Sequence, residues 1–144
     1  MISARLVAMI EDHAEQLTSG LVRTLERHPR TSGYHTLLHS ELHDRAYDVY
    51  HNLSKWVSRG SESEVEASYA DLGRRRRQEG IPLDQVVFAL LLTKDHLLEY
   101  VRMSGLSDTA LDLYQELELL RMVGQFFDRA IYHAVRGYQG AAGG

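Results

Sequence analysis

The fold is decided by residues 72–102, LGRRRRQEGIPLDQVVFALLLTKDHLLEYVR, which hold a helix end, a tight turn and the most apolar helix of the chain. Gly80 fits the position just past a helix C-terminus, where the backbone is left-handed and a side chain would be strained. Pro82 fits the start of the next helix, where a missing N–H group costs nothing. Residues 86–92, VVFALLL, are apolar on every side of a helix. We therefore expect a central core helix, or one shared with a second subunit.

Composition indicates one ordinary globular domain. The chain has 144 residues, of which 44% are hydrophobic and 25% are charged, and it has no cysteine. A chain of this size can bury a core without disulfides or structural metals. The net charge of −4 gives no field that favours nucleic acid, so no nucleic-acid partner is expected.

Charges near the N-terminus argue against a signal peptide, and the short apolar runs argue against a membrane-spanning segment. Arg5, Glu11 and Asp12 interrupt the N-terminus, where a signal peptide needs an unbroken apolar stretch. The longest apolar run, residues 86–92, is too short to cross a bilayer. The sequence therefore predicts a soluble cytoplasmic protein without a membrane partner.

Apolar residues recur at three- and four-residue steps along most of the chain, and no segment shows the two-residue alternation of a strand. We predict an all-α, single-domain bundle of about five helices over residues 1–144, with a long last helix. The predicted helices cover residues 3–27, a start within 36–41 to 59, 61–78, 82–103 and 107–138. Residues 139–144 are predicted to be a flexible tail. A short turn at Gly105 makes the last two helices antiparallel neighbours.

Histidines gather at the start of the second predicted helix. His39 and His43 are four residues apart and would share one side of a helix, as ligands of haem or a transition metal do. Ser40 is, however, a plausible N-cap, which would leave His39 outside the helix. No H-E-x-x-H pattern or third ligand accompanies the pair. We predict no cofactor and no metal site, with haem or a transition metal at these two histidines as the alternative.

Four consecutive arginines, residues 74–77, end the third predicted helix. A cluster of cations can bind an anionic partner, but it also complements the helix dipole at a C-terminus. Since four consecutive residues point in four directions around a helix, we expect these side chains to spread over a solvated face.

The last two helices each carry a second apolar line besides the core-facing one. Few helices are available to cover both lines, and exposed apolar patches usually mark interfaces. We therefore predict a homodimer whose interface contains Phe88, Leu91, Leu92, Leu119, Met122 and Phe126.

Two charged residues interrupt the main apolar faces of the same helices. Lys94 and Glu116 lie equally far in sequence from Gly105, so an antiparallel hairpin brings them to one level. We predict a buried or half-buried ion pair, with the alternative that Lys94 extends its amine to solvent.

Two stretches resemble a known family: residues 72–101, LGRRRRQEGIPLDQVVFALLLTKDHLLEYV, and residues 113–138, LYQELELLRMVGQFFDRAIYHAVRGY. They are similar to the N-terminal helical domain of RsbT co-antagonist proteins of the RsbRD type. The likeness extends more loosely over residues 38–57 and 64–73, and it is most specific at residues 80–83 and 126–130.

The resemblance implies a helical sensory or dimerisation module of bacterial stress-response or two-component-type signalling, associated with stressosomes. In that arrangement, the long last helix would pass a change of packing caused by a ligand or partner to a signalling partner or output domain. Such domains normally precede an output domain, which this chain has no room for. The chain is therefore a stand-alone member or a fragment. The resemblance names no ligand, and it supplies no catalytic residue.

An enzyme is the weaker interpretation. The sequence has no phosphate-binding glycine loop, nucleophile elbow or complete metal set, and the H-x-x-K-G pattern of histidine phosphotransfer bundles is absent. We therefore expect a non-catalytic sensory or regulatory module. A ligand-free structural dimer is the remaining alternative.

Overall fold

The computed structural model describes residues 4–58, 62–104 and 109–143. Within these ranges the regular elements are all helical and no strand is present, which confirms the predicted all-α fold. No helix in the same ranges has the length and apolar character to span a membrane. The elements are α1 (Ala4–Asp12), α2 (Ala14–Arg27), the 3-10 segment η1 (Pro29–Thr36), α3 (His39–His51), α4 (Leu53–Trp56), α5 (Glu62–Gln78), α6 (Leu83–Met103) and α7 (Ala110–Gly143).

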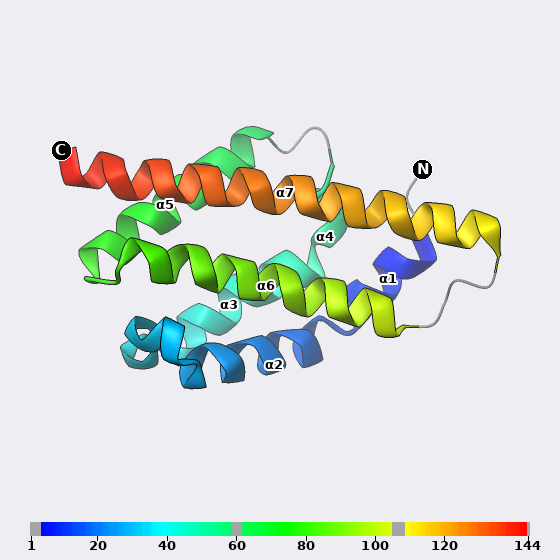
Figure 1. The fold of residues 1–144 in the computed structure, drawn as a ribbon, viewed down its shortest axis with the longest axis horizontal. Helices are drawn as coiled ribbons and strands as arrows, with labels where there is room; N and C mark the ends of the chain where they lie inside the picture. The colour runs from blue at the N-terminus through cyan, green and yellow to red at the C-terminus, as the bar shows by residue number, and fades with distance from the viewer. Residues whose placement is uncertain (1–3, 59–61, 105–108, 144) are drawn as a thin grey trace.

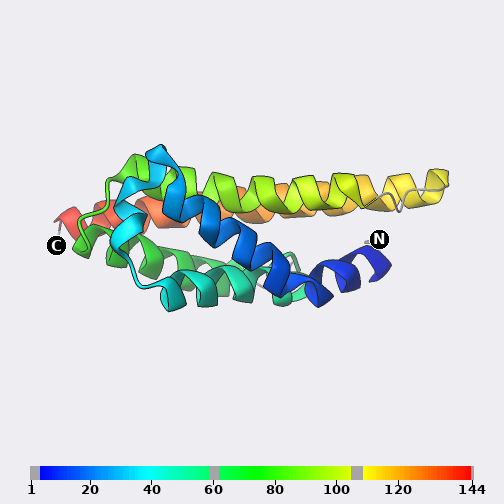
Figure 2. The same cartoon turned by 90° about the horizontal axis from the view of Figure 1, so that it is seen from below.

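Helices α6 and α7 lie side by side and run in opposite directions (Figures 1 and 2), as predicted. The turn predicted at Gly105 lies outside the described residues. Helix α5 packs against α7, and α2 packs against α3. The first turns of α7 project beyond the other helices at one end of the molecule (Figures 1 and 2).

The structure divides two of the predicted helices and lengthens a third. The first helix breaks at His13, whose φ of −106° and ψ of 18° are not helical and whose Nδ1 lies 2.7 Å from the Met9 carbonyl oxygen. The second breaks at Asn52, where φ is −112° and ψ is 34°. Helix α7 continues to Gly143 and therefore extends past residue 138, where the last helix was predicted to end. No proline stops the helix there, and Ala141 and Ala142 have high helix propensity. The flexibility predicted for residues 139–144 stays a prediction.

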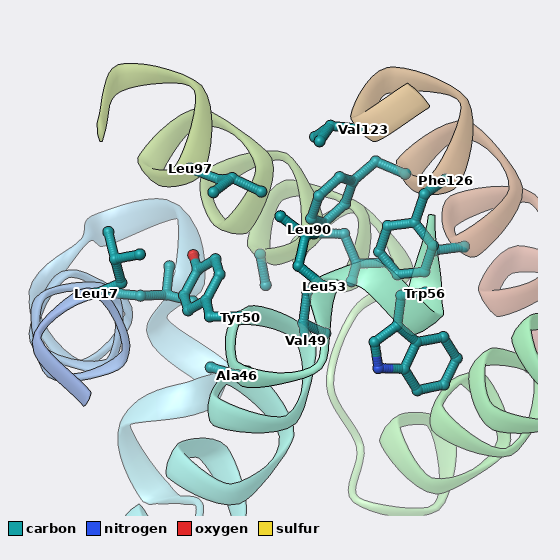
Figure 3. Close-up of a cluster of buried hydrophobic side chains, with 14 of the residues drawn as sticks. Leu17, Ala46, Val49, Tyr50, Leu53, Trp56, Leu90, Leu97, Val123 and Phe126 are labelled. Carbon is teal, nitrogen blue, oxygen red and sulfur yellow. The ribbon is translucent and has the colours of Figure 1, made fainter. Parts of the chain in front are cut away.

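The core lies where α2, α3, α4, α6 and α7 meet (Figure 3). Leu119 and Phe126 belong to this core and are 0% and 3% exposed. The Phe126 ring packs against Trp56, Tyr69 and Phe127. The prediction that these two residues form a subunit interface is therefore wrong, since they have almost no surface to offer a second copy. The labelled residues of Figure 3 are Leu17, Ala46, Val49, Tyr50, Leu53, Trp56, Leu90, Leu97, Val123 and Phe126.

The turn between α5 and α6 has the geometry expected from Gly80. This glycine has a φ of +78°, its N–H donates to the Arg77 carbonyl, and the Ile81 N–H donates to the Arg76 carbonyl, each at 3.0 Å. This pair of bonds is the Schellman motif, which satisfies the last carbonyl groups of a helix. The turn is also tied to α7, because the Tyr138 hydroxyl donates to the Ile81 carbonyl at 2.7 Å.

Helices α5 and α7 come into backbone contact through small residues. A Cβ atom added at Gly73 would lie 2.0 Å from the Ala134 carbonyl oxygen, and one added at Gly137 would lie 2.1 Å from the Ala70 carbonyl oxygen. The two helices can pack this closely only because neither glycine has a side chain. This contact couples the position of α5 to that of α7.

We expect Gly73→Ala to destabilise the protein by about 1–3 kcal/mol, because the two backbones must separate to admit the methyl group. Gly124→Ala on α7 is the matched control, since nothing lies within 4 Å of its added Cβ. The control should be neutral or stabilising by about 0.5–1 kcal/mol, the usual gain of alanine over glycine in a helix. Urea denaturation followed by circular dichroism measures both. Equal stability of the two variants would contradict the close contact.

Candidate functional site

One arginine of the run at residues 74–77 is buried. Arg76 is 2% exposed, and its guanidinium donates through Nη1 to Glu79 Oε1 at 2.8 Å and through Nη2 to Glu41 Oε2 at 3.0 Å. Its Cζ atom lies 5.3 Å from the centre of the Tyr34 ring. This guanidinium therefore joins α5 to α3 and to η1. Its Nε is also buried, and among the described residues it has no hydrogen-bond partner.

Glu41 is the centre of the surrounding charges. Besides Arg76, it meets Arg45 Nε at 3.2 Å and the Arg75 guanidinium at 3.8 Å. Burial disfavours the charge on Arg76, yet Tyr34, Glu79 and Glu41 together raise the pKa of Arg76 above its ordinary value. Burial raises the pKa of Tyr34 to about 12, so this phenol stays neutral. The site thus holds fixed charges inside a largely apolar surrounding.

The expectation that all four arginines spread over a solvated face is wrong for Arg76. The buried stripe of α5 contains Val65, Tyr69 and Leu72, and Arg76 occupies the next position at the same helical spacing. That spacing was readable in the sequence. The carboxylate that makes burial tolerable was not, because Glu41 belongs to a different helix.

A cavity of about 420 Å³ adjoins this buried guanidinium. It lies between α2, η1, α3, α5 and α6, and Trp56 of α4 also lines it. Cavities of this size commonly bind small molecules. Its walls are apolar toward the core and charged around Arg76. The apolar part includes Leu21, Leu25, Leu42, Val49, Ala89 and Leu90.

Arg76→Met should destabilise the protein by about 3 kcal/mol, the lower end of the range for breaking a buried ion pair, because Glu41 and Glu79 keep some contact with solvent. Arg74→Met is the control, since Arg74 is half exposed and its ion pair with Asp71 is long, at 3.8 Å. The control should change stability by less than about 0.5 kcal/mol. Chemical denaturation at neutral pH measures both. Similar small losses in the two variants would show that the Arg76 network does not stabilise the fold.

The two candidate metal ligands lie on the surface between α2 and α3. His39 Nδ1 is 2.8 Å from Glu26 Oε1, and His43 Nε2 is 3.0 Å from Glu15 Oε1. The hydrogen bond with Glu15 raises the pKa of His43. Helix α3 begins at His39, so the prediction of Ser40 as the N-cap is wrong.

His39 and His43 share one face of α3, as their spacing predicts. Their rings stack at 6.4 Å, and the stack continues from His43 to Tyr47 at 5.8 Å and on to His51 at 4.9 Å. Within the described ranges, no group of three or more metal-ligating side chains is assembled. Haem or a transition metal at these residues stays a prediction.

Lys94 and Glu116 are both half-buried. Among the residues that the structure describes, no ion pair between these two is present, and the buried charge network lies instead at Arg76. The predicted pair therefore has no support in the observed contacts. Its two helices are nevertheless antiparallel neighbours, as the prediction assumed.

The remaining candidates for a subunit interface are half-buried. Phe88 is covered by two side chains. The centre of the His28 ring lies 4.9 Å from the centre of the Phe88 ring, and the Arg30 Cζ atom lies 5.7 Å from it. Leu91, Leu92 and Met122 keep part of their surface. Several large apolar side chains are more exposed than these, and four of them lie together at the projecting start of α7: Leu111, Leu113, Tyr114 and Leu117. Leu38, Met103 and Tyr132 are also exposed but lie elsewhere in the chain.

The family follows from the length of sequence that matches. The model of the RsbT co-antagonist protein rsbRD N-terminal domain matches residues 14–143, which include every element from α2 to α7. The chain belongs to this family. The resemblance predicted from residues 72–101 and 113–138 is thereby confirmed, and it extends over the α2 and α3 region. Comparison with curated proteins and with solved structures finds no match. Membership of the rsbRD N-terminal domain family makes this a domain of stress-response signalling.

Proposed function

We propose that the chain is a non-catalytic sensory or regulatory module of bacterial stress-response signalling. In this proposal, occupation of the cavity or binding of a partner shifts α5, and α7 passes the shift on to a signalling protein or output domain of the stressosome type. A cytoplasmic location belongs to the same proposal and is supported by the family.

The observation that carries the proposal is the position of α5 between the cavity and α7. One face of α5 supplies Tyr69, Leu72 and Arg76 to the cavity wall. Gly73, on the same helix, is in backbone contact with α7 at Ala134. A ligand changes the packing of such helices only if it binds two arrangements with different affinity. A ligand in the cavity would bind one arrangement of the helices more tightly than the other. The contact at Gly73 would transmit the resulting shift of α5 to α7.

A homodimer is the second part of the proposal, with the interface moved to the start of α7. Leu113 and Leu117 are four residues apart, and Leu111 and Tyr114 are three apart, so each pair lies along one side of the helix. This part of α7 projects beyond the other helices (Figure 2). A contiguous apolar surface at a projecting helix is typical of a subunit contact.

Light scattering should therefore give a dimer mass for the wild-type protein and a monomer mass for Leu117→Glu. Leu117 is 56% exposed, so the charge should leave the subunit folded while it opposes burial in an interface. Gln125→Glu adds the same charge to an exposed position farther along α7 and should remain a dimer. A monomer mass for the wild-type protein would contradict this part of the proposal.

The regulatory role can be tested by exchanging domains. The chain replaces the N-terminal domain of a co-antagonist protein of the same family, in a bacterium that carries a stress-responsive reporter gene. We expect stress to raise the reporter signal. Gly73→Ala should shift the unstressed signal by at least about fivefold, the lower limit of ordinary allosteric coupling, because it separates α5 from α7.

Gly124→Ala is the control for this exchange, since it alters α7 at a position where an added Cβ meets nothing. It should leave both reporter levels unchanged, and immunoblotting confirms equal amounts of each chimera. The regulatory role fails if the Gly73 and Gly124 variants behave alike. It also fails if an unrelated dimeric helical domain in the same position supports the same stress response.

A further inference from the structure

Three tyrosines are buried among the described residues, and one of them has a hydroxyl without a partner. They are Tyr34, Tyr50 and Tyr69. The Tyr50 hydroxyl donates to the Thr93 carbonyl oxygen at 2.9 Å, and the Tyr34 phenol interacts with the Arg76 guanidinium. Within the part of the chain that the structure describes, the Tyr69 hydroxyl makes no hydrogen bond. Since buried polar groups are normally hydrogen-bonded, packing alone does not account for this hydroxyl.

The Tyr69 hydroxyl belongs to the wall of the cavity of about 420 Å³, because Tyr69 is one of its lining residues. In the described ranges, the side-chain atoms that are sealed from solvent and lack a partner are Thr18 Oγ1 and Arg76 Nε. The Tyr69 hydroxyl is not one of them, so it keeps accessible surface. Because Tyr69 as a whole is only 5% exposed, we assign this surface to the cavity and not to the outside of the molecule.

The polar groups around this hydroxyl already have partners. The positive charge of Arg45 and the negative charge of Asp48 both act on the Tyr69 phenol, and both residues line the same cavity. Arg45 Nε donates to Glu41 Oε1 at 3.2 Å. Asp48 Oδ2 accepts from the Trp56 indole N–H at 3.0 Å. Burial raises the pKa of Tyr69, so its phenol is neutral and has a proton to donate.

The charges of the lining cancel. Three arginines and three acidic residues contribute to it: Arg45, Arg75, Arg76, Glu41, Asp44 and Asp48. The lining as a whole therefore attracts neither anions nor cations. An ion would also lose its hydration on entering the apolar part of the cavity. An uncharged ligand avoids both costs.

Tyr69 also connects the cavity to α7. Its ring packs edge-on against Phe126 of α7, with the two ring centres 5.8 Å apart. Gly73, one turn later on α5, is in backbone contact with α7. A molecule that holds the Tyr69 hydroxyl therefore holds a side chain that packs directly on α7.

We infer that Tyr69 recognises a small, uncharged molecule in this cavity by donating a hydrogen bond to an acceptor oxygen of that molecule. The rest of the ligand is apolar and packs against the apolar part of the lining. Ketones and amides are chemical classes that fit. The inference deepens the proposed sensory function and rests on it for its biological meaning, while the binding itself is measured separately.

The test compares three probes of similar shape: cyclohexyl methyl ketone, isopropenylcyclohexane, in which a methylene group replaces the carbonyl oxygen, and cyclohexanecarboxylate. Binding to the purified chain is measured by calorimetry and by the NMR signal of the indole N–H of Trp56. This residue lines the cavity and is the single tryptophan of the chain. The ketone should bind about tenfold more tightly than the hydrocarbon, which corresponds to about 1.4 kcal/mol. It should also bind more tightly than the carboxylate.

Two variants locate the binding. Tyr69→Phe keeps the aromatic ring and removes only the hydroxyl, so the preference for the ketone over the hydrocarbon should disappear. Tyr100→Phe is the matched control on α6, because Tyr100 does not belong to the lining of this cavity. It should bind all three probes as the wild type does.

A comparison of stability separates a ligand-binding hydroxyl from a structural one. Tyr50→Phe removes a hydroxyl that is hydrogen-bonded to Thr93, and it should raise the equilibrium constant of unfolding about fivefold. Tyr69→Phe should not raise this constant, because its hydroxyl has no partner among the described residues. Urea denaturation without ligand measures both variants. Equal destabilisation would show that the Tyr69 hydroxyl supports the fold, and it would overturn the inference.

The inference is also overturned if the ketone does not bind up to its limit of solubility, if the hydrocarbon or the carboxylate binds as tightly, or if Tyr69→Phe keeps the preference. Normal ketone binding together with a chimera that ignores Gly73→Ala would leave the site standing and refute the proposed function. A chimera that responds to Gly73→Ala, together with a purified chain that binds no ketone, would refute the ligand site alone.

Discussion

The buried guanidinium of Arg76 is the interaction on which the arrangement of the bundle depends. It holds Glu41 of α3 and Glu79 beside the C-terminus of α5, and it lies over Tyr34 of η1. Arg76 is only 2% exposed, and a buried charge is tolerable only when groups of opposite charge are held in place beside it. Three elements must therefore be in place together, and each of them contributes residues to the lining of the cavity.

Local rules of sequence predict the elements that need no distant partner. Gly80 takes the left-handed conformation that its position after a helix indicates, and residues 83–103 form the apolar helix α6. The antiparallel course of α6 and α7 follows from the short link between two long apolar patterns. In each case the determining residues lie within one helix or one turn, so the pattern carries the information.

The candidate site depends on contacts between segments that are far apart in the chain, and sequence reasoning captured little of it. Nothing near Arg76 indicates that Glu41 supplies its partner. The breaks at His13 and Asn52 are likewise missed, because neither proline nor glycine marks them. Leu119 and Phe126 are apolar residues on a second face of α7, and only the packing of Tyr69 and Trp56 shows that this face is interior. Periodicity identifies an apolar face without telling what covers it.

The backbone contact between α5 and α7 also has a consequence for the order of folding. It joins two helices that are separated in sequence by the whole of α6. The α5–α6 turn closes locally through the bonds at Gly80 and Ile81, whereas closing α5 onto α7 must overcome the entropy of a much longer loop. We therefore expect the α5–α6 turn to form early and α7 to dock late.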